Sequence, residues 1–309
     1  MLLYDFKITT PNYFLQYNIN MIKADLHIHS SYSDGSDSLE KLVENIKAEN
    51  LDIFALTDHD LIEGCKDIRG LIPENIQFIP GVELTCKARG CKCHILGYNY
   101  NPDDTGLNSL IAHGKLLRRN KLEKRIAYLK DVWNIPLTEE ELDWLYSRKS
   151  VVKIHLANIL VNRGLSDNNI DAMKKYLDGC KTGNSRFDGD EAIQTIKSAG
   201  GIAVWAHPLG GEGEVHLTKE EFLPLLETLI QCGIQGLECY YSRYTKEESE
   251  FLVQCAHRYN LLTTGGSDYH GSNKDVKLAQ LNIANTPVDA ELFTLLHKIE
   301  RGSSPLSIL

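Results

Sequence analysis

The feature that most constrains the fold of this chain is a repeated alternation of short apolar runs and amphipathic helical patterns. The apolar runs predict strands at 22–29, 51–60, 76–86, 93–100, 201–208, 234–241 and 261–271. Apolar residues at helical spacing predict helices at 37–50, 190–200, 218–233 and 245–260. This alternation is typical of an α/β fold with a mostly parallel sheet and helices outside it. About seven strands over this length favour a barrel over an open sheet.

The alternation of strand and helix patterns stops between residues 101 and 188, where the patterns are helical with no convincing strand. We therefore expect a helical insertion at 101–188, which interrupts a barrel domain made of 22–100 and 189–309. The segment LLRRNKLEKR, 116–125, makes the insertion locally basic, and a solvated helix face is its expected role. Residues 1–21 form a detached N-terminal extension. It is either a non-native start upstream of the natural Met21 or an ordinary surface arm.

Composition narrows the possible functions. The net charge is −9, so broad coating of an extended nucleic-acid duplex is not expected, although a local basic pocket for phosphate is compatible with it. No apolar run approaches the roughly 20 residues that span a bilayer, and no signal peptide is visible. The eight cysteines are scattered, which favours a reducing cytoplasm over a disulfide framework.

Polar side chains that suit metal binding gather where the predicted strands end. They are His27, His29, Asp58, His59, Glu83, His207, Glu238, Asp268 and His270, together with His94 at the start of its strand. In parallel α/β barrels the carboxyl ends of several strands form the active site. A single polar residue there is usually a cap or a turn former, but six strands contributing such groups are hard to obtain by chance. Histidine and carboxylate ligands suit zinc, manganese or iron.

The spacing HIH places His27 and His29 on one face of a strand, because strand side chains alternate. Leu26 and Ile28 then belong to the opposite face. A lone HxH is a weak signal, since many such histidines are ordinary core or surface residues. Here it is joined by SDG at 33–35, TDHD at 57–60 and GSDYH at 266–270, and the combination is a strong signal of metal binding.

These segments carry a resemblance. DLHIHSSYSDGS, ALTDHD, GVELTC, HILGY, AHP and GGSDYHG resemble, in this order, the motifs of the polymerase and histidinol phosphatase (PHP) family. The order and the helical insertion are most similar to its stand-alone bacterial branch of nucleotide and RNA phosphoesterases. The resemblance extends from about residue 22 to 271. It implies a distorted (β/α)7 TIM-like barrel, the PHP fold, with a trinuclear metal centre at the strand ends.

The resemblance also implies which residues hold the ions, three divalent cations of Mn²⁺, Zn²⁺ or Fe²⁺. One ion would be held by His27, His29, Glu83 and Asp268. A second would take His94 and His207 and share Glu83, and a third would take Asp34, His59 and His270. Asp25 and Asp58 neighbour these residues and are expected to orient imidazoles from behind.

The implied reaction is hydrolysis of a phosphate ester. Divalent ions lower the pKa of a bound water toward about 7 and offset charge on phosphoryl oxygens, so the expected attacking group is metal-bound hydroxide. The expected substrates are 3′,5′-bisphosphonucleotides or short 5′-phosphorylated oligoribonucleotides. Two alternatives stay open: a histidinol-phosphate phosphatase, which the insertion and the Asp34 motif disfavour, and a non-catalytic metal-binding accessory module, which the full ligand set disfavours. The sequence does not encode the oligomeric state.

Substrate contacts are less well encoded. Arg243 would grip a second phosphate with its planar guanidinium, and Tyr240 or Tyr241 would stack on a base. Rim packing and a surface arginine are the alternative for these three. In the insertion, His155 keeps its family position, but Lys153 stands where the family usually has arginine and offers a point charge instead of a bidentate fork.

Three cysteines, Cys86, Cys91 and Cys93, crowd beside His94. A structural zinc site would need a fourth ligand and the usual Cys-x-x-Cys spacing, and neither is evident. Reduced cysteines in a hairpin are therefore expected. A redox-sensitive hairpin that perturbs His94 on oxidation is the alternative.

Overall fold

The computed structural model describes residues 21–88, 90–183, 186–212 and 214–302. The expectation that residues 1–20 are a non-native start lies outside these residues, as does the end of the predicted barrel domain, 303–309. The strands are β1 Ala24–Ile28, β2 Ile53–Leu56, β3 Gln77–Ala88, β4 Cys91–Tyr98, β5 Phe187–Asp188, β6 Ile202–Trp205, β7 Gly236–Tyr241 and β8 Leu262–Gly266.

The strands form a nearly closed barrel, in the order β1-β2-β3-β4-β6-β7-β8, with β5 added beside β3. β8 lies next to β1 at the point of closure. There the His29 amide donates to the Tyr269 carbonyl at 2.9 Å, and the Asp268 amide donates to the His27 carbonyl at 2.8 Å. The predicted α/β barrel is confirmed. Its closure brings the first and last sequence motifs together, although more than two hundred residues separate them.

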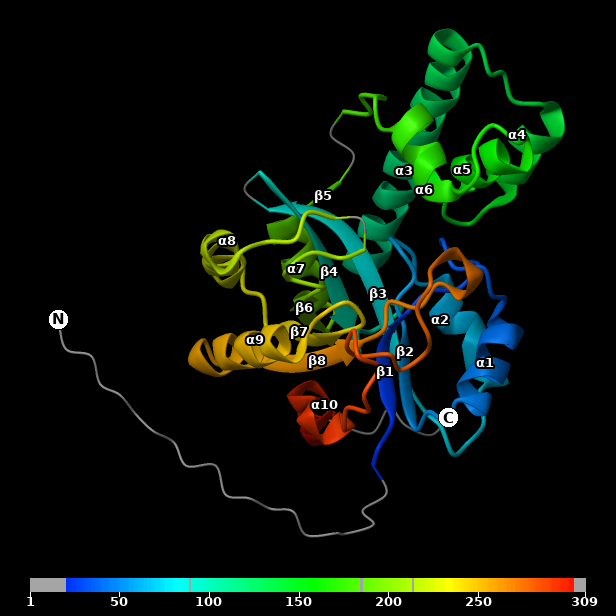
Figure 1. Ribbon diagram of the computed structural model, residues 1–309. Coiled ribbons are helices and arrows are strands. Elements are labelled where there is room, and N and C mark those ends of the chain that lie inside the picture. The colour runs from blue at the N-terminus through cyan, green and yellow to red at the C-terminus, as the bar shows by residue number, and fades with distance from the viewer. Residues whose placement is uncertain (1–20, 89, 184–185, 213, 303–309) are drawn as a thin grey trace.

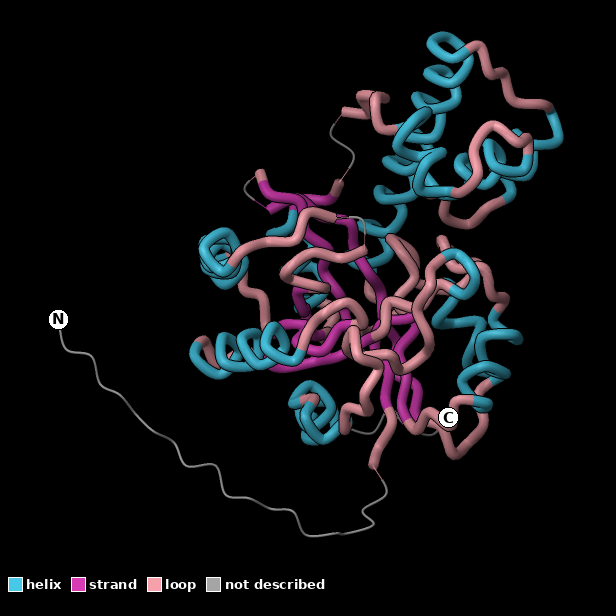
Figure 2. Tube along the Cα trace, viewed as in Figure 1, coloured by secondary structure: helices cyan, strands magenta, loops and turns pink. Residues whose placement is uncertain are grey.

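Helices cover the outside of the barrel (Figures 1 and 2). They are α1 Leu39–Ala48, α2 Glu63–Asp67, α7 Gly189–Ser198, α8 Lys219–Gln231, α9 Lys246–Arg258 and α10 Thr294–Gly302, with 3-10 turns at Ile68–Leu71, Gly271–Asn273 and Ala290–Leu292. Side-chain caps define where four of them start: Ser38, Asp188, Thr218 and Thr245 accept from the first-turn amides of α1, α7, α8 and α9. No helix in the described part of the chain is long and apolar enough to cross a membrane.

One strand of the barrel is reversed. β4 runs antiparallel to both of its neighbours, β3 and β6, and forms a hairpin with β3. Its beginning therefore lies at the end of the barrel where the parallel strands finish. This reversal explains why His94, near the start of its strand, reaches the same end as residues that follow the other strands.

A β-bulge in β1 changes which side chains share a face. The pairing of β1 with β2 shifts register between Asp25 and Ile28. Leu26 then packs in a cluster with residues of β6 and α10, whereas Ile28 packs in the cluster beneath α1. The expectation that Leu26 and Ile28 lie together is wrong, because a bulge inserts one residue and inverts the alternation beyond it.

The insertion forms a helical lobe that projects from the barrel (Figure 1). It contains α3 Thr105–Trp133, α4 Glu139–Ser147, α5 Lys153–Asn162, α6 Asn169–Ala172 and a π-helical turn at Met173–Leu177. The lobe has its own apolar cluster, which includes Leu129, Leu145 and Leu160. The expectation of no strand before residue 189 is wrong at the last two residues, where β5 pairs with β3. Two residues are too few to show a strand period.

The closure of the barrel generates a stability prediction at Gly266. A Cβ atom there would lie 2.1 Å from the His27 Cβ and 2.6 Å from the His27 amide nitrogen. We expect Gly266→Ala to lower the free energy of unfolding by about 3 kcal/mol, because backbone of β1 would have to move. Urea unfolding checks this, with Gly70→Ala as the control, since a Cβ at Gly70 meets open space. Equal stability of the two variants would contradict the tight β1–β8 closure.

Candidate metal centre

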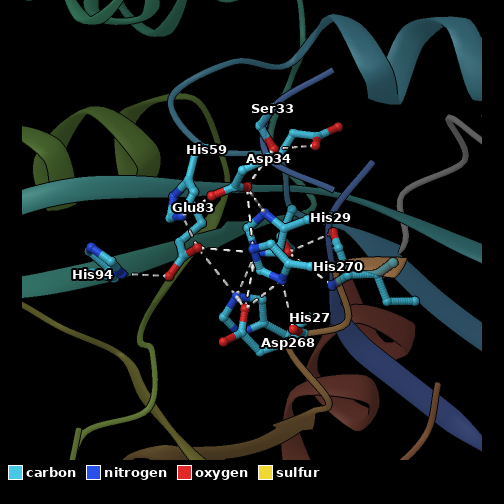
Figure 3. A network of polar contacts seen from close by, with 12 residues as sticks. His27, His29, Ser33, Asp34, His59, Glu83, His94, Asp268 and His270 are labelled. Carbon is cyan, nitrogen blue, oxygen red and sulfur yellow. Dashed lines mark hydrogen bonds and ion pairs between the residues drawn. The ribbon is translucent and has the colours of Figure 1, made fainter. Parts of the chain in front are cut away.

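The structure gathers the nine predicted ligands at the carboxyl end of the barrel (Figure 3). Three groups have ligand atoms that all lie within 4.8 Å of one another. The groups are His27, His29, Glu83 and Asp268; Glu83, His94 and His207; and His29, Asp34, His59 and His270. These sets match those implied by the resemblance, except that His29 also joins the third. Glu83 and His29 thus each belong to two groups.

Glu83 lies at the middle of the centre. It is 1% exposed, and its carboxylate oxygens lie 2.9 to 3.3 Å from ring nitrogens of five histidines. These histidines are His27, His29, His59, His94 and His207. Several of these distances are within hydrogen-bonding range, so the carboxylate and the rings converge on shared space.

Several of these atoms nevertheless have no hydrogen-bond partner. The buried Nδ1 atoms of His29, His59 and His94 and the buried Oε2 of Glu83 are all unsatisfied. Nδ1 of His59 lies only 3.1 Å from Glu83 Oε2. The two atoms are therefore close enough for a hydrogen bond, but they do not form one. The atoms do not point along each other's lone pairs. Buried polar atoms are normally paired, and unsatisfied nitrogens and oxygens that converge on common points fit divalent ions coordinated between them.

The first histidine of the HIH motif is held by a carboxylate that the sequence left without a role. Glu238 in β7 is fully buried, and its Oε1 lies 2.9 Å from His27 Nδ1. Its Oε2 accepts the His207 amide at 2.7 Å. With Nδ1 engaged from behind, His27 presents Nε2 to the centre. Glu238 therefore positions two candidate ligands on two strands.

Asp25 and Asp58 have a different role from the expected one. Asp25 accepts from the amide of Ser267 at 2.9 Å, its hydroxyl at 2.5 Å and the amide of Ala279 at 2.8 Å. Asp58 accepts from the Ser30 amide at 2.9 Å and the Ser33 hydroxyl at 2.6 Å. Neither carboxylate has a hydrogen bond to an imidazole among the described residues. They hold the backbone of the ligand-bearing loops, while Glu238 is the carboxylate that orients a ring.

Two candidate ligands have strained backbones. His207 and Asp268 have φ values of 29° and 60°, in the left-handed region that most side chains avoid. Each residue lies two positions after the last residue of its strand, β6 or β8. Such strain persists where surrounding contacts overdetermine it, and it concentrates at functional sites.

Burial and charge set the ionisation of the centre. Burial alone would raise the pKa of Glu83, but the imidazoles of His59, His94 and His27 outweigh it and hold that pKa well below its usual range. Burial lowers the pKa of His59 to about 3, which keeps this ring neutral near pH 7, whereas neighbouring carboxylates outweigh burial and raise the pKa of His29 to about 9 and that of His207 to about 10. An ionised carboxylate and a neutral imidazole are the forms that bind metal ions.

A polar cavity of about 170 Å³ opens onto the centre. Seven of the nine candidate ligands line it, together with Gly211, Glu212, Glu214 and Lys274. Lys274 Nζ lies 2.7 Å from Asp268 Oδ2, and Glu214 lies 3.4 Å from His207 Nδ1. The sequence analysis missed both residues. Lys274 lies only four positions after His270, whereas the position of Glu214 depends on the fold of the glycine-rich loop after His207.

The five expected substrate contacts are distributed differently. Tyr241 lies beside the centre, where its hydroxyl donates to Asp268 at 3.0 Å. Tyr240 lies with its ring 5.6 Å from that of Phe293, away from the ligands, because β7 shifts register after Glu238. Arg243 donates to Glu212, which lines the cavity, at 2.6 Å.

The two substrate contacts expected in the insertion, Lys153 and His155, also lie in different surroundings. Lys153 forms an ion pair with Asp178 inside the insertion and does not line the cavity. The lysine that stands where the family usually has arginine is therefore not part of the cavity wall. His155 is buried, with Nδ1 accepting the Val152 amide at 3.2 Å, and burial lowers its pKa to about 4.

The cysteines beside His94 are free thiols in the β3–β4 hairpin. Cys86 and Cys93 face each other in the ladder, and Cys91 is exposed at the start of β4. Burial raises the pKa of Cys86 and raises that of Cys93 to about 12. Both thiols are protonated at neutral pH and poorly nucleophilic. Reduced cysteines in a hairpin are what the structure contains, and the redox-sensitive hairpin stays a hypothesis.

The role of Glu238 generates a prediction about metal affinity. Glu238→Gln keeps the side-chain volume but removes the charge that fixes His27 and the His207 amide, so we expect metal affinity to fall by about 10- to 100-fold. Titration of metal-free protein with Mn²⁺ measures this. Glu250→Gln, an exposed change on α9, is the control. Wild-type affinity in Glu238→Gln would contradict the positioning role.

Comparison with known proteins places these residues in a family context. A family model described as PHP domain matches residues 25–275. A 5′-3′ exoribonuclease from Haemophilus influenzae is 33% identical over 80% of this chain and 90% of its own length. A phosphoribosyl 1,2-cyclic phosphate 1,2-diphosphodiesterase from Eggerthella lenta is 29% identical over 80% and 94%. A 3′,5′-nucleoside bisphosphate phosphatase from Chromobacterium violaceum is 26% identical over 81% and 88%.

A solved structure shares the fold. It comes from Bifidobacterium adolescentis, is assigned as a metal-dependent phosphoesterase, and superposes with a TM-score of 0.78 at 26% identity. The alignment covers 92% of this chain and 98% of that one, so it includes the helical lobe as well as the barrel.

Proposed function

This chain belongs to the PHP domain family and is a hydrolase of phosphate esters, and on that premise we propose that it acts on the ends of short 5′-phosphorylated oligoribonucleotides. We propose that three divalent ions, held by the three ligand groups, support the reaction. The second candidate substrate is a 3′,5′-bisphosphonucleotide, which the similarity to the Chromobacterium violaceum phosphatase favours.

The observation that carries the proposal is the set of three converging ligand groups with unsatisfied buried nitrogens and oxygens. Bound divalent ions would supply an acidic water and offset the negative charge on the phosphoryl group. The protein contributes the arrangement: Glu238 fixes His27, and Tyr241 and Lys274 both contact Asp268 Oδ2. Glu83 and His29, each shared by two groups, set the spacing between the ion positions.

The cavity supports a terminal phosphate as the reacting group. Its volume of about 170 Å³ is that of roughly six water molecules in the liquid. A phosphate group fits within it. Lys274 Nζ faces this cavity and can donate to a phosphoryl oxygen while it remains paired with Asp268. A single chain end would enter, and the remaining nucleotides would stay outside.

A substrate panel tests the proposal. With Mn²⁺ present, we expect turnover of a 5′-phosphorylated RNA pentamer, and of 3′-phosphoadenosine 5′-phosphate if the second candidate holds. Histidinol phosphate should not be hydrolysed. Phosphate release and product length are measured beside elemental analysis of the protein. Hydrolysis of histidinol phosphate alone would replace the proposal with that activity, and no turnover despite bound metal would refute it.

Ligand variants test the centre itself. We expect His29→Ala or Asp268→Ala to reduce kcat by more than about 100-fold, beyond the usual effect of losing a residue behind a ligand. The thermal unfolding midpoint and near-UV circular dichroism show whether the fold survives. His257→Ala, an exposed change on α9, is the matched control. A variant of either ligand that is active and contains its full metal complement would refute the assignment.

A further inference from the structure

The basic run in α3 is solvated on one side, as its sequence predicts, because Arg119 and Lys124 are exposed, but its other side is partly buried. Arg118, Lys121 and Arg125 occur at helical positions i, i+3 and i+7 and therefore share one face, over about 10 Å of the axis. That face is turned inward. Arg118 is 9% exposed, and Lys121 and Arg125 are largely buried. Half-buried cations are costly unless paired.

The first of these cations is paired and lies at the edge of the metal centre. Arg118 Nε donates to Asp60 Oδ2 at 2.7 Å, and its Nη2 donates to Thr85 Oγ1 at 3.1 Å. Asp60 directly follows His59, and Thr85 pairs with His94 across the β3–β4 ladder. Arg118 thus stands immediately behind two candidate ligands, and the α3 face begins at the centre and leads away from it.

Among the residues that the structure describes, the cations further along form no ion pair with a carboxylate. Nε of Arg125 is buried without a hydrogen-bond partner, and so is Nη1 of Arg186, which directly precedes β5. Burial, followed by the charges of Arg118 and Arg186, lowers the pKa of Lys121 to about 7. The nearby carboxylates have other partners: Asp178 pairs with Lys153, and Asp188 caps α7.

We infer that Lys121, Arg125 and Arg186 form a binding track for the phosphates of an oligonucleotide downstream of the reacting end. This inference rests on the proposed function, because the centre would hold the terminal phosphate. Guanidinium groups with unsatisfied donors, here those of Arg125 and Arg186, are suited to phosphate oxygens. An array extended along a helix suits a chain of phosphates better than one isolated anion.

The test uses binding without turnover. Protein loaded with Mn²⁺ is titrated with a 5′-phosphorylated, 3′-fluorescein RNA pentamer that has hydrolysis-resistant phosphorothioate linkages, and anisotropy is read at several KCl concentrations. We expect the double change Lys121→Gln and Arg125→Gln to weaken binding at least 10-fold. At pH 6, where the Lys121 ammonium is protonated, it should also reduce the slope of log K against log salt by about 1.4, since each lost contact on a single strand contributes about 0.7.

The matched control is the double change Lys130→Gln and Lys174→Gln, which removes the same charge from exposed positions of the insertion. We expect it to change affinity by less than 2-fold. Equal effects of the two double changes, or no binding by the wild-type protein, would overturn the track. This binding test involves no hydrolysis. A substrate panel without RNA turnover would therefore refute the proposed function without deciding whether the phosphate track exists.

A second readout separates binding from a structural role. Removing unpaired, half-buried cations should leave the thermal unfolding midpoint of the Lys121→Gln/Arg125→Gln protein unchanged or higher. The RNA pentamer should raise the midpoint of the wild type more than that of this variant. A lower midpoint without RNA would show that the cations stabilise the fold, and that result would overturn the proposal.

Discussion

A single buried carboxylate organises the functional end of this molecule. Glu83 lies within 3.3 Å of ring nitrogens from five histidines, and these come from different segments of the barrel. An ion buried this deeply costs several kcal/mol in lost hydration. The surrounding imidazoles offset that cost and keep the carboxylate ionised. Strand closure, loop conformation and ring orientation can all be understood as ways of holding ligands around this group.

Much of this arrangement can be predicted from the sequence, and the reason is physical. The candidate ligands follow apolar runs, and a parallel barrel brings the ends of such runs together. The motif order then groups residues as distant as His27 and Asp268, which the structure places in one ligand group. The reversed strand was compatible with this prediction because His94 lies near the start of β4, and a reversed strand starts where its neighbours end.

The errors have causes that the sequence does not display. Strict alternation along β1 and β7 mispredicts Leu26 and Tyr240, because each strand contains a register shift. Asp25 and Asp58 were expected to orient rings, yet their hydrogen bonds go to serine groups and backbone amides brought near by loop folding. The basic run of α3 reads as exposed by helical period alone. Arg118 is nevertheless buried, because tertiary folding brings its side chain to Asp60 and Thr85.

The β3–β4 hairpin extends beyond the residues that bear ligands. Glu83 pairs with Leu96 and Thr85 with His94, whereas the ladder continues outward to Ala88 and Cys91. The inner pairs of the ladder contain the candidate metal ligands Glu83 and His94, whereas the outer pairs contain none. The outer residues Cys86 and Lys87 also pair with β5, the short strand at the end of the insertion. The same hairpin thereby joins the ligand-bearing part of the barrel to the point where the chain returns from the helical lobe.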